Sequence, residues 1–163
     1  MATADNLKDA FAGESQANRK YLAFAKKADE EGYEQVAKLF RAAADAETVH
    51  AHAHLRVMGG IGETKANLQE AIGGETHEFT EMYPSFIEVA EKEGNAGAEM
   101  SFKNANAVEE IHAGLYQKAL DDLGSNQGTD YYVCQVCGNT VEGEAPDKCP
   151  ICGAPKKMFK KID

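Results

Sequence analysis

The chain has 163 residues, and 27 acidic against 17 basic side chains give it a formal net charge of −10. That balance argues against nucleic-acid binding, which depends on Lys and Arg contacts to phosphate, and against an anionic membrane surface. No apolar run approaches the ~20 residues that span a bilayer, and no signal peptide is recognisable. We therefore expect a cytoplasmic protein with no nucleic-acid partner and no membrane partner.

Residues 3–123 have a helical composition, because Ala, Glu and Lys are abundant and Pro84 is the one proline. A glycine commonly follows the last turn of a helix, so the glycines divide this region into four predicted helices. They cover residues 4–31, residues 33–58, a segment from 64–68 to about 94, and residues 95–123. Pro84 lies inside the third helix and predicts a kink there.

The composition changes after the fourth helix. Residues 124–130, GSNQGTD, have the Gly, Ser, Asn and Asp content of a linker. All four cysteines and three of the four prolines follow it. We predict a helical domain over residues 1–124 and a small domain over residues 130–163.

The helical region repeats itself at a spacing of 62 residues, so that the first predicted hairpin resembles the second. Glu47 then aligns with Glu109, and His50 with His112. With a slip of one residue near the start, Glu14 aligns with Glu75. A site between two such hairpins is expected to be nearly two-fold symmetric.

Each predicted helix carries an apolar stripe at helical spacing, interrupted near its middle by carboxylates or imidazoles. A buried carboxylate costs several kcal/mol unless it is paired or protonated, and no Lys or Arg stands at these positions. Metal ions are the natural counter-charge. Glu and His three residues apart project to the same side of a helix, although a single such pair is more often structural. The ligand candidates are Glu14, Glu47, His50, Glu75, Glu78, Glu109 and His112.

This set of residues matches the known di-iron pattern of four-helix bundles. In that pattern, two helices each provide one Glu and the other two each provide a Glu-x-x-His pair. Tyr21 follows Glu14 by seven residues and Tyr83 follows Glu78 by five. Their hydroxyl groups would be able to hold ligand carboxylates in place. Spacing alone fits plain core tyrosines equally well.

The four cysteines form two Cys-x-x-Cys pairs, each followed by a glycine that lets the backbone turn. In a chain without an export signal, this spacing favours a metal over disulfides. Four thiolates make a tetrahedral site that suits zinc or iron, and the spacing does not decide between them. The predicted ligands are Cys134, Cys137, Cys149 and Cys152.

The whole chain resembles the rubrerythrin family in the segments AGESQANRKY, AETVH, GETHEFTEMYP, VEEIH and CPICGAPKKMF. The resemblance implies an all-α fold, a ferritin-like four-helix bundle with a non-haem di-iron site. A small rubredoxin-like domain follows, with one iron held by the four cysteines. It also implies a peroxidase that reduces hydrogen peroxide to water and protects against oxidative stress.

The resemblance further assigns roles to individual ligands. Glu47 and Glu109 would bridge the two irons. Glu14 would be a terminal ligand of the first iron, and Glu75 and His112 would be terminal ligands of the second.

The first iron would also take Glu78 or His50, depending on its oxidation state. Glu78 breaks the internal symmetry, because its counterpart in the first helix is Ala17. An extra carboxylate suits a ferric ion and a neutral imidazole suits a ferrous one. Tyr21 and Tyr83 fall on positions beside the ligands in the family.

In this reading, the thiolate-bound iron passes electrons to the di-iron pair, and an NADH-linked reductase or a rubredoxin supplies them. Two rivals remain open. An iron-handling ferroxidase would accumulate ferric mineral, and a redox-inert protein would carry zinc in the four-cysteine site. An oxidised iron–thiolate centre is red, whereas a zinc centre is colourless.

Two features of the sequence predict a homodimer or a larger oligomer. The linker begins about 16 Å beyond His112 at 1.5 Å per residue, so docking onto another subunit looks easier than folding back. In addition, residues 59–63 reach only roughly 17–20 Å, less than the bundle length that a family-like connection must cross. Either the third helix starts late, after Gly73 and Gly74, or helices are exchanged between subunits.

Overall fold

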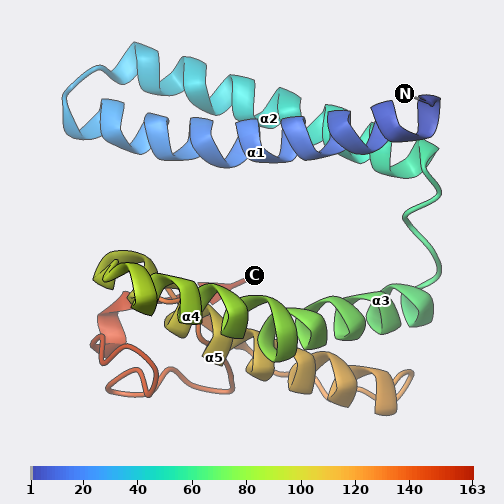
Figure 1. The fold of residues 1–163 in the computed structure, drawn as a ribbon, viewed down its shortest axis with the longest axis vertical. Coiled ribbons are helices and arrows are strands. Elements are labelled where there is room, and N and C mark those ends of the chain that lie inside the picture. The colour runs from blue at the N-terminus through green and yellow to red at the C-terminus, as the bar shows by residue number, and fades with distance from the viewer. Residues whose placement is uncertain (1) are drawn as a thin grey trace. The chain divides into compact units, whose positions relative to one another are not determined.

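The computed structural model describes residues 2–163, and its course is shown in Figure 1. Two compact units divide at Gly62, and each is described by itself. No helix in the described range is long and apolar enough to cross a membrane. The elements are α1 (Thr3–Glu30), α2 (Glu34–Val57), α3 (Thr64–His77), η1 (Glu78–Met82), α4 (Tyr83–Glu93), α5 (Ala96–Asp121), β1 (Tyr131–Cys134), β2 (Thr140–Glu142), η2 (Lys156–Met158) and β3 (Phe159–Ile162).

The first unit is the hairpin of α1 and α2 (Figure 1). Gly32, with φ +81°, makes the turn between them, as a glycine after a helix end is expected to do. The buried apolar residues of this hairpin are all alanines, whose small side chains let two helices approach closely. They are Ala25, Ala28, Ala37, Ala44 and Ala51.

The second unit begins with a second hairpin, in which α3, η1 and α4 run on as one long helix and pack against α5. The four expected helices are thus confirmed. The late start that we considered for the third helix is wrong, because α3 begins at Thr64 and continues through Gly73 and Gly74.

The regular α-helix is interrupted directly before Pro84, whereas the kink expected there stays a prediction. The five residues before Tyr83 form a π-helix, in which the Tyr83 N–H donates to the carbonyl of Glu78, five residues earlier. Pro84 then stands in the first turn of α4, where a proline is tolerated. A π-turn holds one residue more than an α-turn. It therefore accounts for the slip in the repeat, which is 61 residues at Glu75 and 62 at Tyr83.

The C-terminal segment of the second unit is a small antiparallel sheet in the order β2-β1-β3. Val133 of β1 lies opposite Thr140 of β2 and Lys160 of β3. Against our expectation, this segment folds back onto α5 of its own chain: Lys118 Nζ lies 2.6 Å from Glu142 Oε2. The linker therefore gives no reason to expect docking onto a partner subunit, and the homodimer stays a prediction.

Candidate metal centres

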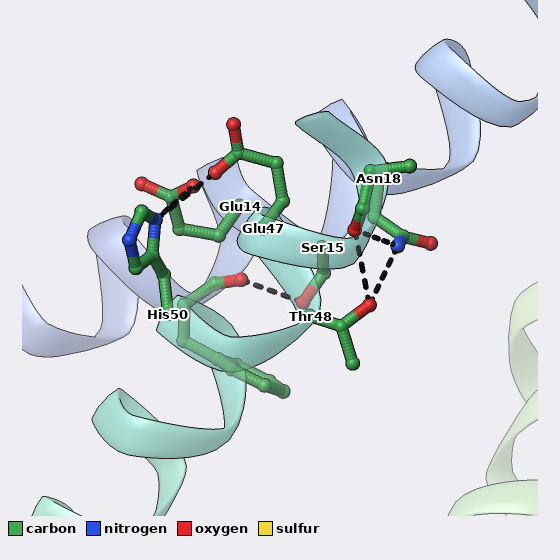
Figure 2. Close-up of polar contacts among 8 residues, drawn as sticks. Glu14, Ser15, Asn18, Glu47, Thr48 and His50 are labelled. Carbon is green, nitrogen blue, oxygen red and sulfur yellow. Dashed lines mark hydrogen bonds and ion pairs between the residues drawn. The ribbon is translucent and has the colours of Figure 1, made fainter. Parts of the chain in front are cut away.

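The first unit brings Glu14 of α1 together with Glu47 and His50 of α2 (Figure 2). The Nδ1 atom of His50 lies 3.2 Å from Glu47 Oε2 and 3.7 Å from Glu14 Oε2. One potential ligand atom from each of the three residues lies within 4.8 Å of the others. This first cluster forms at the expected positions, since Glu47 and His50 are three apart on one helix face.

Two polar residues that sequence reasoning missed fasten the helices beside this first cluster. Asn18 is buried and its Nδ2 donates to the carbonyl of Ala44 at 2.7 Å and to Thr48 Oγ1 at 2.8 Å. Figure 2 shows Asn18 and Thr48 next to Glu14 and Glu47. The signal available in the sequence was a polar Asn on a helix face that is otherwise rich in alanine.

The second cluster consists of Glu75 from α3 with Glu109 and His112 from α5. The Nδ1 atom of His112 lies 2.8 Å from Glu109 Oε2 and 3.8 Å from Glu75 Oε1. The two clusters therefore repeat the same three residue types with the same nitrogen facing the two carboxylates.

The carboxylates of each cluster perturb one another. Burial, followed by the charges of Glu109 and Glu78, raises the pKa of Glu75 to about 7. In the first cluster, the hydrogen bond between the two carboxyl groups raises the pKa of Glu14 and lowers that of Glu47. Crowded carboxylates that lack Lys or Arg partners fit a bound cation.

The remaining candidates lie around the clusters. Glu78 stands at the start of η1, and its charge contributes to the raised pKa of Glu75 and of Tyr83. Burial is the largest cause of the Tyr83 shift. Tyr21 packs in a ring cluster with Phe24 and Phe40, and Tyr83 packs similarly in the second unit. No hydrogen bond from either tyrosine hydroxyl is found among residues 2–163, so the structure does not show them holding a carboxylate.

The four cysteines converge in the small sheet domain, and none forms a disulfide. Cys134 Sγ lies 3.7 Å from Cys152 Sγ, and Cys137 Sγ lies 3.6 Å from Cys149 Sγ. A tetrahedral ion at about 2.3 Å from each sulfur places the sulfurs about 3.8 Å apart. The thiols thus already stand close to the geometry of a four-thiolate metal site.

Backbone amides support thiolates here, and the glycine after each Cys-x-x-Cys pair allows the backbone to turn. Gly138 and Gly153 adopt φ +84° and +76°. Burial by itself raises the pKa of Cys149, but the backbone N–H groups of Cys152 and Ile151 outweigh it and lower that pKa to about 7. Burial raises the pKa of Cys137. The buried Asn139 side chain, which the sequence did not single out, donates to Cys149 Sγ at 3.7 Å.

The cysteine domain touches the second cluster. Thr140 Oγ1 lies 2.8 Å from His112 Nε2. Thr140 was not a candidate, because nothing in its neighbourhood in the sequence distinguishes it from any other strand threonine. The contact nevertheless joins the two predicted metal centres of this unit.

Known proteins share both parts of the chain. Residues 5–120 match the rubrerythrin family, and residues 132–160 match the rubrerythrin rubredoxin-like domain. This chain belongs to the rubrerythrin family. Nigerythrin of Nitratidesulfovibrio vulgaris is 39% identical over 97% of this chain and 85% of its own length. Rubrerythrin-2 of Clostridium acetobutylicum is 38% identical over 97% and 95%.

Solved structures of nigerythrin also resemble this chain. A partially reduced nigerythrin matches with a TM-score of 0.61 and 37% identity, over 99% of this chain and 87% of that one. The family binds iron, and the donor sets fit it: carboxylates with imidazoles in the two clusters, and four thiolates in the sheet domain. The chain thus has the ligand groups of a di-iron protein with a rubredoxin-like iron centre.

Proposed function

We propose that this protein is a peroxidase that reduces hydrogen peroxide to water at a di-iron site and receives its electrons through the four-cysteine iron. The proposal rests on the position of the cysteine domain. Its strand β2 packs on α5, the helix that contains Glu109 and His112. A storage protein has no use for a thiolate centre beside its carboxylate cluster, whereas an electron relay needs that proximity.

The di-iron site would form when the two clusters face each other. Together they offer four carboxylates and two imidazoles, and four negative charges balance two ferrous ions. Glu78 adds a fifth carboxylate, which offsets charge when iron becomes ferric. In this assignment Glu47 and Glu109 would be shared between the two irons, and His50 and Glu78 would be alternative ligands of the first iron.

Each hairpin also leaves large apolar side chains uncovered. Phe24 is 48% exposed in the first unit and Phe86 is 43% exposed in the second, at equivalent positions of the repeat. Exposed aromatic faces of this size favour burial against another helix pair. Because α3 starts at Thr64, a short connection joins the hairpins, so we favour a homodimer in which hairpins are exchanged between chains.

The overall reaction takes hydrogen peroxide, two electrons and two protons to two molecules of water. Iron held by the two clusters would supply the electrons and would take up charge from the oxygen atoms. The chain's own part is to hold the ligands: Asn18 and Thr48 fasten α1 to α2 beside the first cluster, and α3 packs on α5 beneath the second. Tyr83 keeps its proton at neutral pH, because burial and three nearby carboxylates raise its pKa.

Relatives support redox chemistry. Nigerythrin structures are described as partially reduced, mixed-valence, and fully reduced with all-ferrous iron. For the present chain we propose an NADH-linked reductase or a rubredoxin as donor, acting in the cytoplasm.

The test separates the relay from the chemistry. Cys149→Ser removes a thiolate ligand but leaves both Glu/His clusters intact, so the reduced variant should be oxidised once by peroxide. Its peroxide-dependent oxidation of NADH, measured with a surrogate reductase, should stop. Lys157→Ser, an exposed change in the same domain, is the control. Continued turnover by Cys149→Ser would refute the electron relay.

Two further observations would support the alternative functions. Ferric mineral formed from Fe(II) and air would support a ferroxidase, and a colourless zinc-loaded protein would support the redox-inert alternative.

A further inference from the structure

One hydroxyl group connects the second cluster with the cysteine domain. Thr140, the first residue of β2, places Oγ1 2.8 Å from His112 Nε2. The same hydroxyl donates to the carbonyl oxygen of Gly138 at 3.1 Å. Gly138 directly follows Cys137. A chain of hydrogen bonds therefore runs from a predicted iron ligand of α5 to the loop that carries a predicted thiolate ligand.

The protons in this series of hydrogen bonds can be assigned by counting donors and acceptors. A threonine hydroxyl has one proton, and at Thr140 that proton goes to Gly138. The hydroxyl oxygen must then accept from His112, so Nε2 of His112 carries a hydrogen. In a neutral ring, the lone pair is left on Nδ1, which faces Glu109 and Glu75. A lone pair that faces two carboxylates is the arrangement that a cation between them requires.

Contacts on both sides of Thr140 keep the loop in this place. A Cβ atom at Gly138 would lie 3.8 Å from Val108 Cγ1, one helical turn before His112. Farther along α5, Lys118 pairs with Glu142 of β2. The contact of the Thr140 hydroxyl thus lies between an apolar contact and an ionic contact, which together dock the cysteine domain on α5.

The equivalent ring of the first cluster lacks such a support. His50 is 57% exposed, and in the described chain its polar contacts are those of Nδ1 with Glu47 and Glu14. His112 is 28% exposed, and both of its nitrogens have polar contacts, the one at Nε2 coming from outside the hairpin. The repeat supplies the same ligand twice, and only the second copy is fastened from outside the hairpin.

We propose that Thr140 is a positioning residue for the di-iron site, which fixes the His112 ring with Nδ1 toward Glu75 and Glu109 and couples it to the Cys137–Gly138 loop of the same chain. Its redox consequence rests on the proposed function. With iron bound, one electron would pass from a ferrous four-cysteine iron, which would become ferric, to the di-iron site, which would be reduced by one electron. The hydrogen bonds through Thr140 would offer a route between the two centres.

The test compares Thr140→Val, which keeps the β-branched shape and removes the hydroxyl, with Thr140→Ser, which keeps the hydroxyl. Thr129→Val, in the exposed linker, is the matched control. In the full chain loaded with diamagnetic Zn²⁺, nitrogen-15 NMR of the histidines reports the exchange of the His112 Nε2 proton with water. We expect Thr140→Val to accelerate that exchange by about tenfold or more, as an outer-shell partner should, and Thr140→Ser to retain protection.

In the iron-loaded full chain, stopped-flow absorbance after mixing the reduced protein with peroxide follows the four-cysteine iron as it turns red. Thr140→Val should slow this step by about tenfold, and Thr140→Ser should restore it. Unchanged proton exchange in Thr140→Val would overturn the positioning role, and equal slowing by Val and Ser would show that packing acts instead of the hydroxyl. If the wild type fails to react with peroxide, the proposed function fails, while the NMR experiment still decides the role of Thr140.

Discussion

The two Glu/His clusters are built from the same residues, yet they differ in what surrounds them. The first depends on contacts inside its own hairpin, with Asn18 and Thr48 beside it and His50 largely exposed. The second has a more buried imidazole, a raised carboxyl pKa at Glu75 and a domain docked against it. A duplicated ligand set therefore does not give two equivalent metal positions, because the neighbours decide how rigid and how charged each position is.

The π-turn adds to this difference. It inserts one residue into the second hairpin just after Glu75, and Glu78 begins it. The aligned position of the first hairpin is Ala17, in regular α-helix. The second cluster thus gains a third carboxylate nearby, beside Glu75 and Glu109, and π-turns recur at functional sites for this kind of local change.

The largest expected difference concerns the two histidines. His112→Ala should lower peroxide turnover by at least about 100-fold, the upper end of what losing an outer-shell partner costs, and should reduce the iron bound per chain. His50→Ala should cost about tenfold, because Glu78 replaces His50 in the proposed ligand exchange. Iron content and steady-state rates measure both. Equal losses from the two substitutions would mean that the clusters are functionally equivalent.

A smaller effect is expected from restoring the symmetry. Glu78→Ala copies the residue of the first hairpin, and we expect turnover to fall by about tenfold with little change in helix content. The loss should be largest for the return from the ferric to the ferrous state, which the exchange of Glu78 for His50 would accompany. Glu81→Ala, an exposed glutamate of the same π-turn, is the control. A variant with wild-type rates would remove Glu78 from the mechanism.

Much of this arrangement was predictable from the sequence. The helix ends follow from glycines, and the Glu-x-x-His pairs lie three residues apart on one helix, so local geometry alone brings Glu47 to His50 and Glu109 to His112. The two Cys-x-x-Cys pairs converge as their spacing predicts. Even the slip in the repeat was visible, although its cause, the π-turn at Pro84, was not.

The contacts that distinguish the clusters could not be predicted in this way. Thr140 meets His112 across 28 residues and a linker, and no periodicity reports such a distance. We expected the domain to avoid its own helix because we considered only the reach of the linker. The packing of Val108 on Gly138 and the pair of Lys118 with Glu142 provide the missing attraction.

The next expected effect is on stability in the metal-free protein. Glu75 keeps its proton up to a pKa of about 7 in the folded state, against an ordinary value of 4.5. Between these values the folded state binds more protons than the unfolded state, so stability should fall as pH rises from about 4.5 to 7 and then level off.

Glu75→Gln should flatten this decline, whereas Glu70→Gln, an exposed change on the same helix, should not. Urea midpoints across pH 4–8, measured with chelator present, supply the comparison. A Gln variant with the wild-type slope would show that burial of Glu75 is not what destabilises the metal-free second cluster. With metal bound, the wild type should lose the slope as well, because the cation replaces the proton as the counter-charge.

The smallest effect should come from the ion pair at the edge of the docked domain. Lys118 is 59% exposed, and its hydrogen bond to Glu142 raises its pKa. Exposed pairs of this kind contribute about 0–1 kcal/mol and weaken as salt rises. Lys118→Ala should therefore lower thermal stability slightly and leave the His112 Nε2 proton protected, in 0.1 M and in 1 M salt alike. If this substitution exposed that proton as fully as Thr140→Val, docking would depend on surface charge. The second cluster would then be held no more firmly than the first whenever ionic strength is high, and the difference between the two histidines would disappear with added salt.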